Sequence, residues 1–89
     1  MELKFTQHVL LQMLKRSIPT AHIKDAIMKG ETIENYPNDK PYPSFLKLQF
    51  VSGNPLHVVA AQTATETVVI TAYFPDPLRW KANFKERIK

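Results

Sequence analysis

Apolar residues recur at helical spacing over residues 6–15, and Thr6 is suited to cap the start of this segment. Pro19 disfavours helical geometry in the residue before it and suits the opening turn of a new helix. A second apolar pattern at helical spacing then ends at Gly30, a residue that readily adopts the left-handed conformation of a helix C-cap. The two segments predict an N-terminal helical hairpin.

Beyond the second helix, apolar residues alternate with polar ones, which is the pattern of half-buried strands. Four strands are predicted, over residues 31–36, 45–51, 56–62 and 67–73. Three prolines within residues 37–43 disfavour strand pairing there and predict a stiff loop. Helical spacing returns over residues 78–88. The predicted fold class is α+β, with an N-terminal helical hairpin, a four-stranded antiparallel meander and a C-terminal helix.

The length and composition are those of one small folded unit. A chain of 89 residues with 44% apolar content can build one hydrophobic core, so a single domain over residues 1–89 is expected. The absence of cysteine excludes disulfide bonds and thiolate metal sites, and the three histidines lack the spacing of zinc ligands. No signal peptide or membrane span is recognisable. We therefore expect a cytoplasmic protein with no membrane partner, metal ion or cofactor.

The charge of the chain favours a polyanionic partner. The formal net charge is +4, and lysine and arginine release counterions when they bind phosphate. Four cations gather near the C-terminus: Lys81, Lys85, Arg87 and Lys89. They could bind phosphate or complement the dipole of the predicted last helix. Trp80 and Phe84 could stack on bases, although their helical spacing is more typical of core residues.

Alternation along the strands separates two faces of the predicted sheet. One face is entirely apolar and should be buried against the helices; it consists of Leu46, Leu48, Phe50, Leu56, Val58, Ala60, Val68, Ile70 and Ala72. The other face mixes apolar residues with Lys47, Gln49, His57, Thr71 and Tyr73. If these residues form one site, His57 would act as acid or base, Lys47 would stabilise charge and Tyr73 would donate a hydrogen bond. The alternative is a solvated sheet face without a chemical task.

Short motifs along nearly the whole chain carry a family resemblance. They are His8, Arg16-Ser17-Ile18, the run GETIENYP over residues 30–37, Pro43-Ser44, the run PLHVV over residues 55–59, the run TAYFPDP over residues 71–77, and Trp80. In combination they resemble the prokaryotic domain-of-unknown-function family 4258. His8, Arg16, His57 and Tyr73 match positions of that family, whereas Lys47 is a candidate from the face pattern alone.

The predicted order of elements is similar to that of RelE-like toxins, which are small basic proteins that cleave RNA without a metal ion. This resemblance implies a toxin-type endoribonuclease that binds RNA or the ribosome and is neutralised by an antitoxin protein. His57 would be the base or acid, and Tyr73 would position the RNA or donate a hydrogen bond to it. Lys47 and Arg16 would stabilise the developing charge. The expected RNA contacts are His8, Gln49, Thr71, Lys81, Lys85 and Arg87.

Two other functions are compatible with the sequence. The chain could be a non-catalytic interaction module, in which the proline loop over residues 37–43 presents Tyr42 and Phe45 to a partner. It could also bind a small molecule in a hollow of the mixed face. Loss of RNA cleavage on replacing His57 would favour the enzyme, and loss of protein binding on replacing Tyr42 would favour the module.

Overall fold

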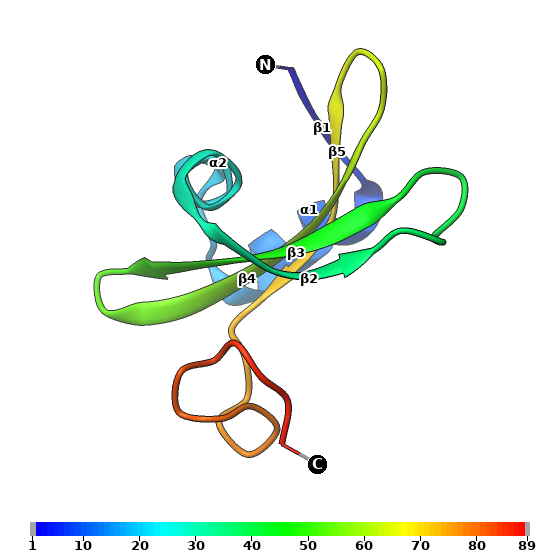
Figure 1. Cartoon of the computed structure of the whole chain (residues 1–89). Coiled ribbons are helices and arrows are strands. Elements are labelled where there is room, and N and C mark those ends of the chain that lie inside the picture. Colours follow the sequence, from blue (N-terminus) through cyan, green and yellow to red (C-terminus); the bar gives the residue numbers. More distant parts are fainter. Residues whose placement is uncertain (1, 89) are drawn as a thin grey trace.

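A mixed sheet with two helices against it makes up the fold (Figure 1). The computed structural model describes residues 2–88. The elements within that range are β1 (Leu3–Phe5), α1 (Gln7–Arg16), α2 (Thr20–Lys29), β2 (Glu31–Tyr36), β3 (Ser44–Val51), β4 (Asn54–Gln62) and β5 (Thr67–Tyr73). Neither helix in this range has the length and apolar character needed to cross a bilayer.

The α+β class and the two predicted helices are confirmed, but the helix caps differ from expectation. The two helices pack mainly on the sheet rather than on each other, so they do not form the expected hairpin. Thr6 caps α1, since its hydroxyl accepts a hydrogen bond from the Val9 amide at 3.1 Å. The helix cap with the left-handed conformation is Ser17, with φ 55, at the end of α1. Gly30 at the end of α2 has φ −70 and is not left-handed, so that prediction was wrong. A Cβ at Gly30 would lie only 2.3 Å from the Ala26 carbonyl oxygen, so glycine is required there by close packing.

The sheet has five strands rather than the expected four, and it is not purely antiparallel. Its strand order is β1-β5-β4-β3-β2, and β1 pairs with β5 in parallel through Leu3↔Thr67 and Phe5↔Val69. The remaining neighbours pair antiparallel. β1 contains only three residues, too few for its alternation to be seen in the sequence. The prediction of a four-stranded antiparallel meander was therefore wrong.

The predicted C-terminal helix is also absent from the part of the chain that the structure describes. Residues 74–88 form turns instead, which we call the C-terminal segment. Two of these turns are closed by side chains, because Asp76 accepts from the Leu78 amide and Asn83 from the Lys85 amide, each at 2.9 Å. Such local bonds compete with helix formation. In Figure 1 this segment lies across the strands from α2.

One face of the sheet, the helix-side face, packs against α1 and α2. Its core includes Val58, Ala72, Val9 from α1 and Ile23 from α2, all fully buried. Phe45 packs against this core, so the proline loop does not present it to a partner, whereas Tyr42 in the loop is 48% exposed. Burial of these apolar surfaces supplies the main stabilisation of the fold.

The predicted division of side chains between the two faces was wrong for β3. Leu48 pairs with His57 and Lys47 with Val58, so Leu46 and Leu48 share the face of His57. This register is fixed by the two-residue turn Ser52-Gly53, in which both residues have positive φ, as in a tight hairpin turn. Because side chains alternate, this phase places Lys47 on the face opposite to His57.

A bulge in the pairing of β4 with β5 shifts the alternation again. The register changes between Val59 and Ala60, so that Ala60 pairs with Val69. Val69 is fully buried in the core, whereas Val68 and Ile70 line a hollow beside the proline loop. The face opposite to the helices, which we call the outer face, contains Leu46, Leu48, His57, Val59 and Tyr73.

Candidate functional site

Three polar side chains form a row on α1. His8, Gln12 and Arg16 are four residues apart and so lie on one side of the helix. His8 Nε2 lies 3.0 Å from the hydroxyl oxygen of Thr71 in β5, which places this row beside β5. At the other end, Arg16 donates from Nε to the Gln12 side-chain oxygen at 3.1 Å. Arg16 also lines a hollow together with Tyr73, at the end of β5 where the C-terminal segment begins.

A hollow at this end of the sheet gathers three guanidinium groups. We call it the arginine pocket, and it is lined by Arg16, Tyr73, Phe74, Asp76, Arg79, Trp80 and Arg87. Its residues come from α1, from the end of β5 and from the C-terminal segment. Polar and apolar walls are thus combined around a concave surface, as in ligand sites.

The three arginines differ in their partners. Arg87 binds Glu34 through Nε at 3.3 Å and Nη2 at 3.2 Å, and its guanidinium lies 4.6 Å from the Trp80 ring centroid. Arg79 makes only a 3.9 Å contact with Asp76, and its side chain is 84% exposed. Arg16 has no carboxylate partner within residues 2–88. Of the three arginines in the pocket, Arg16 and Arg79 are therefore the more available to an anionic ligand.

Glu34 organises the charged side chains beside the pocket. It accepts hydrogen bonds from Tyr36 and Arg87. Burial opposes ionisation of Glu34, but these two hydrogen bonds and the positive charge of Arg87 together hold the pKa of Glu34 below its usual value. Burial and the bond to Glu34 raise the pKa of Tyr36 to about 12. The Glu34 carboxylate therefore remains ionised and fixes Arg87 at neutral pH.

His57 and Tyr73 meet on the outer face, as the sequence predicts. The imidazole is fully buried, with Nε2 2.8 Å from the Phe84 carbonyl oxygen and Nδ1 3.3 Å from the Tyr73 hydroxyl. A carbonyl can only accept, so Nε2 carries the proton, and Nδ1 accepts from Tyr73. The Trp80 ring packs edge-on against the imidazole at 4.5 Å.

The surroundings of these two rings determine their protonation. Burial lowers the pKa of His57 and raises the pKa of Tyr73, so both are uncharged at neutral pH. Both nitrogens of His57 are engaged inside the protein. His57 is thus placed to position Tyr73 and the C-terminal segment rather than to contact a substrate. Tyr73, which is half-buried, lines the arginine pocket.

Two other predicted residues lie away from this site. Lys47 is on the helix-side face, with its ammonium group 5.6 Å from the Phe45 ring centroid. Gln49 donates to Asp25 of α2 at 2.7 Å, and this hydrogen bond lowers the pKa of Asp25. The structure therefore does not bring Lys47 and Gln49 together with His57.

The predicted lysine contacts lie on the surface of the C-terminal segment. Lys81 pairs with Glu86 at 3.1 Å, and Lys85 pairs with Glu31 of β2 at 2.9 Å. Arg87, in contrast, lies in the arginine pocket. The second of these ion pairs and the Arg87–Glu34 pair both join the C-terminal segment to β2.

Sequence reasoning missed Arg79 and Asp76 as site residues, and it placed Trp80 on a helix. Asp76 and Trp80 belong to the motifs quoted above, and Arg79 stands directly beside Trp80. The position of Arg79 next to the motif residue Trp80 could have marked it as a site candidate. Within residues 2–88, no group of three or more histidines and acidic residues is placed to hold a metal ion.

A family model described as "Domain of unknown function (DUF4258)" matches residues 5–74. The chain belongs to the DUF4258 family. The match includes the row on α1 and the His57–Tyr73 pair, and it ends before Arg79 and Arg87. No curated protein and no solved structure is significantly similar to this DUF4258 chain. The RelE-like fold expected from the order of elements therefore has no support, and the sheet and C-terminal segment differ from that expectation.

Proposed function

We propose that this DUF4258 domain binds single-stranded RNA by its phosphates in the arginine pocket and cleaves the strand there. The observation that supports this function is the convergence of Arg16, Arg79 and Arg87 on one hollow that Tyr73 also lines. Guanidinium groups present a planar set of donors that matches phosphate oxygens. The net charge of +4 would add a favourable long-range attraction to a polyanion.

The arginines would have different roles toward a phosphate. Arg16 and Arg79 are exposed and can turn toward a ligand. Arg87 is already bound to Glu34, so it would contribute charge at the pocket wall without leaving its partner. The Tyr73 hydroxyl stays protonated at neutral pH, because burial raises its pKa, and it donates its proton to His57, so Tyr73 would shape the pocket wall rather than bind the phosphate.

Cleavage would use the 2′-hydroxyl of the RNA as the nucleophile. Its oxygen attacks the neighbouring phosphorus while a base removes its proton, and the bond to the 5′-oxygen breaks, leaving a 2′,3′-cyclic phosphate and a 5′-hydroxyl that takes a proton from solvent. His8 carries an exposed imidazole two helical turns from Arg16 on the same side of α1, and it is our candidate base for a strand that runs along this row. Arg16 and Arg79 would stabilise the charge that develops on the phosphate.

A cleavage assay tests this function directly. We expect the wild-type protein, in the presence of EDTA, to cut end-labelled single-stranded RNA into products with cyclic phosphate ends and to leave DNA of the same sequence intact. Arg16→Gln should lower the rate at least about tenfold, because a charge contact in the transition state is lost. Lys15→Gln, which removes the neighbouring exposed cation on α1, is the matched control. Binding without cleavage would reduce the function to RNA binding.

A protein-interaction module is the second candidate, and one surface favours it. Leu10, Leu11 and Leu14 on α1 are 51%, 49% and 79% exposed. An exposed apolar helix face of this kind is typical of interaction sites. A photo-crosslinker at position 14 should then give one discrete protein adduct in cells, with a crosslinker at the exposed Lys24 of α2 as the control. Equal labelling from both positions would argue against a specific partner.

A further inference from the structure

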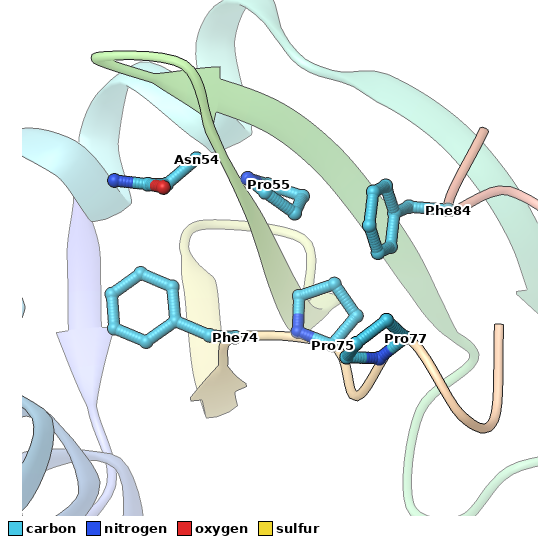
Figure 2. A pocket seen from close by; sticks show the side chains of 6 residues that line it. All are labelled: Asn54, Pro55, Phe74, Pro75, Pro77 and Phe84. Carbon is cyan, nitrogen blue, oxygen red and sulfur yellow. The ribbon is translucent and has the colours of Figure 1, made fainter. Parts of the chain in front are cut away.

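A second hollow shares a wall with the arginine pocket. We call it the apolar pocket; it has a volume of about 400 Å³ and is lined by Asn54, Pro55, Phe74, Pro75, Pro77 and Phe84. Phe74 is the residue common to both hollows. Figure 2 shows the Phe74 and Phe84 rings at the two ends of the apolar pocket, with Pro75 and Pro77 between them. A ligand held in the arginine pocket could therefore extend into the apolar pocket past Phe74.

Phe84 has an uncommon backbone conformation and is held in place by its contacts. Its φ is 57, in the left-handed region that bulky residues rarely adopt. Its carbonyl oxygen accepts the hydrogen bond from buried His57, and its ring packs edge-on against Phe50 at 6.4 Å. Strained residues persist where the surrounding structure fixes them, and they are frequent at ligand sites. The His57 side chain thus fixes the position of an aromatic ring that faces a pocket.

The lining of the apolar pocket suits a flat aromatic ligand with polar edges. Phenylalanine and proline side chains provide apolar surfaces, and Phe74 is 43% exposed. Asn54 lies above Phe74 in Figure 2, and its side-chain amide makes no hydrogen bond within residues 2–88. An amide that offers both a donor and an acceptor can bind the edge of a base. Unpaired bases stack on aromatic side chains in proteins that bind single-stranded RNA.

We propose that the apolar pocket binds one unpaired base of an RNA strand whose phosphate lies in the arginine pocket. This proposal rests on the proposed function, since the guanidinium groups select a phosphate-bearing strand as the occupant. The base stacks on Phe74 and Phe84, and Asn54 contacts its edge. His57 acts as a positioning residue, because it holds the Phe84 backbone without touching the strand.

Fluorescence anisotropy with a matched pair of strands tests this proposal. One strand is a labelled single-stranded heptamer of 2′-O-methyl adenosine, which cannot be cleaved, and the other carries the same backbone without bases. The variants are Phe74→Ala and Phe84→Gly, since glycine tolerates the left-handed backbone at position 84. Leu78→Ala is the control, because Leu78 is 84% exposed and lies outside both pockets. Thermal melts confirm that each variant is folded.

We expect wild type to bind the base-bearing strand more tightly than the abasic strand. Phe84→Gly should weaken binding of the base-bearing strand about tenfold, the scale of one lost stacking contact, and leave abasic binding unchanged. Phe74 also lines the arginine pocket, so Phe74→Ala should weaken the base-bearing strand about tenfold and the abasic strand clearly less. Equal affinities of wild type for the two strands, or equal losses for both in Phe74→Ala, would overturn the base pocket. Since Phe74 is partly exposed, its variant remains informative if Phe84→Gly fails to fold.

The two proposals fail in different ways. If neither strand binds, or if Arg16→Gln changes the affinity of neither, the proposed RNA function fails and the base pocket fails with it. If Arg16→Gln weakens both strands but bases add no affinity, only the base pocket fails, and the arginine pocket remains a phosphate site.

Discussion

The two faces of the sheet are covered in different ways. The helix-side face packs against α1 and α2 through apolar side chains such as Val9, Ile23 and Val58, which are fully buried. The outer face is covered in part by the irregular C-terminal segment, whose contacts centre on His57 and Trp80. This segment also makes ion pairs to β2.

The helices that cover one face mainly stabilise the fold, whereas the C-terminal segment that covers the other mainly sets the geometry of the site. Apolar packing is strong but non-directional, whereas hydrogen bonds and ion pairs fix groups in defined orientations. The helices therefore supply most of the free energy of folding. The C-terminal segment adds less stability, and it places Arg79 and Arg87 beside Arg16 in the arginine pocket.

The largest effect on stability is expected from a cavity on the helix-side face. Ile23→Ala removes a fully buried side chain from the core, and the free energy of unfolding should fall by about 3–5 kcal/mol. Chemical denaturation monitored by circular dichroism measures this change. A loss below about 1 kcal/mol would mean that the helix-side face is not the main source of stability.

His57→Ala is expected to lower the free energy of unfolding less than Ile23→Ala does, but to loosen the C-terminal segment strongly. The variant leaves the Phe84 carbonyl and the Tyr73 hydroxyl without their buried partner, which should cost about 2–3 kcal/mol. The C-terminal segment should loosen, so trypsin should cut after Arg79 and Lys81 faster than in wild type. If the cleavage rate at these sites is unchanged in a folded variant, His57 does not hold the segment.

The same contact predicts how stability depends on pH. Burial lowers the pKa of His57 below its usual 6.5, so the unfolded chain binds a proton at a pH where the folded protein does not. The His57 contribution is therefore fully present above about pH 6.5 and is lost as pH falls through the folded pKa. Glu34 and Asp25, whose pKa values are lowered from 4.5 and 3.8, lose their contributions only at lower pH.

Denaturation midpoints of wild type and His57→Gln between about pH 5 and about pH 7.5 isolate this effect, because the glutamine does not titrate. The stability advantage of wild type should shrink as the solution becomes more acidic. An advantage that stays constant or grows would mean that the imidazole is charged in the folded protein.

The smallest effect is expected at an exposed ion pair. Lys85→Gln removes the contact with Glu31, but both side chains are about half exposed, at 42% and 58%. The free energy of unfolding should change by no more than about 1 kcal/mol. Trypsin cleavage after Arg79 should stay close to the wild-type rate. A large loss of stability would show that surface charges, and not His57, hold the C-terminal segment.

Local sequence patterns were sufficient for much of the fold. The two helices and the four longer strands were predicted near their observed bounds because their periodicity is continuous over several residues. β1 is too short to show a period. Trp80, Phe84 and Ile88 have helical spacing, but side-chain bonds from Asp76 and Asn83 close turns instead.

The strand pattern made the candidate site predictable where it depends on neighbouring strands, whereas Arg16 entered through the family resemblance and Arg87 through the cluster of C-terminal cations. His57 and Tyr73 pair directly across β4 and β5, so a hairpin with alternating faces brings them together. Lys47 was misplaced because the phase of β3 depends on the turn at Ser52-Gly53. The approach of Arg16 to Arg79 depends on the path of the C-terminal segment, and no local pattern encodes that path.

The central claim is that the arginine pocket holds RNA phosphates. The most direct test is the affinity of a labelled, uncleavable single-stranded RNA for wild type, Arg16→Gln and the Lys15→Gln control, measured at two salt concentrations. We predict that Arg16→Gln weakens binding at least about fivefold and flattens the salt dependence, because a phosphate contact and its released counterion are lost. Lys15→Gln should have a smaller effect. Equal affinities for wild type and Arg16→Gln at both salt concentrations would contradict the account.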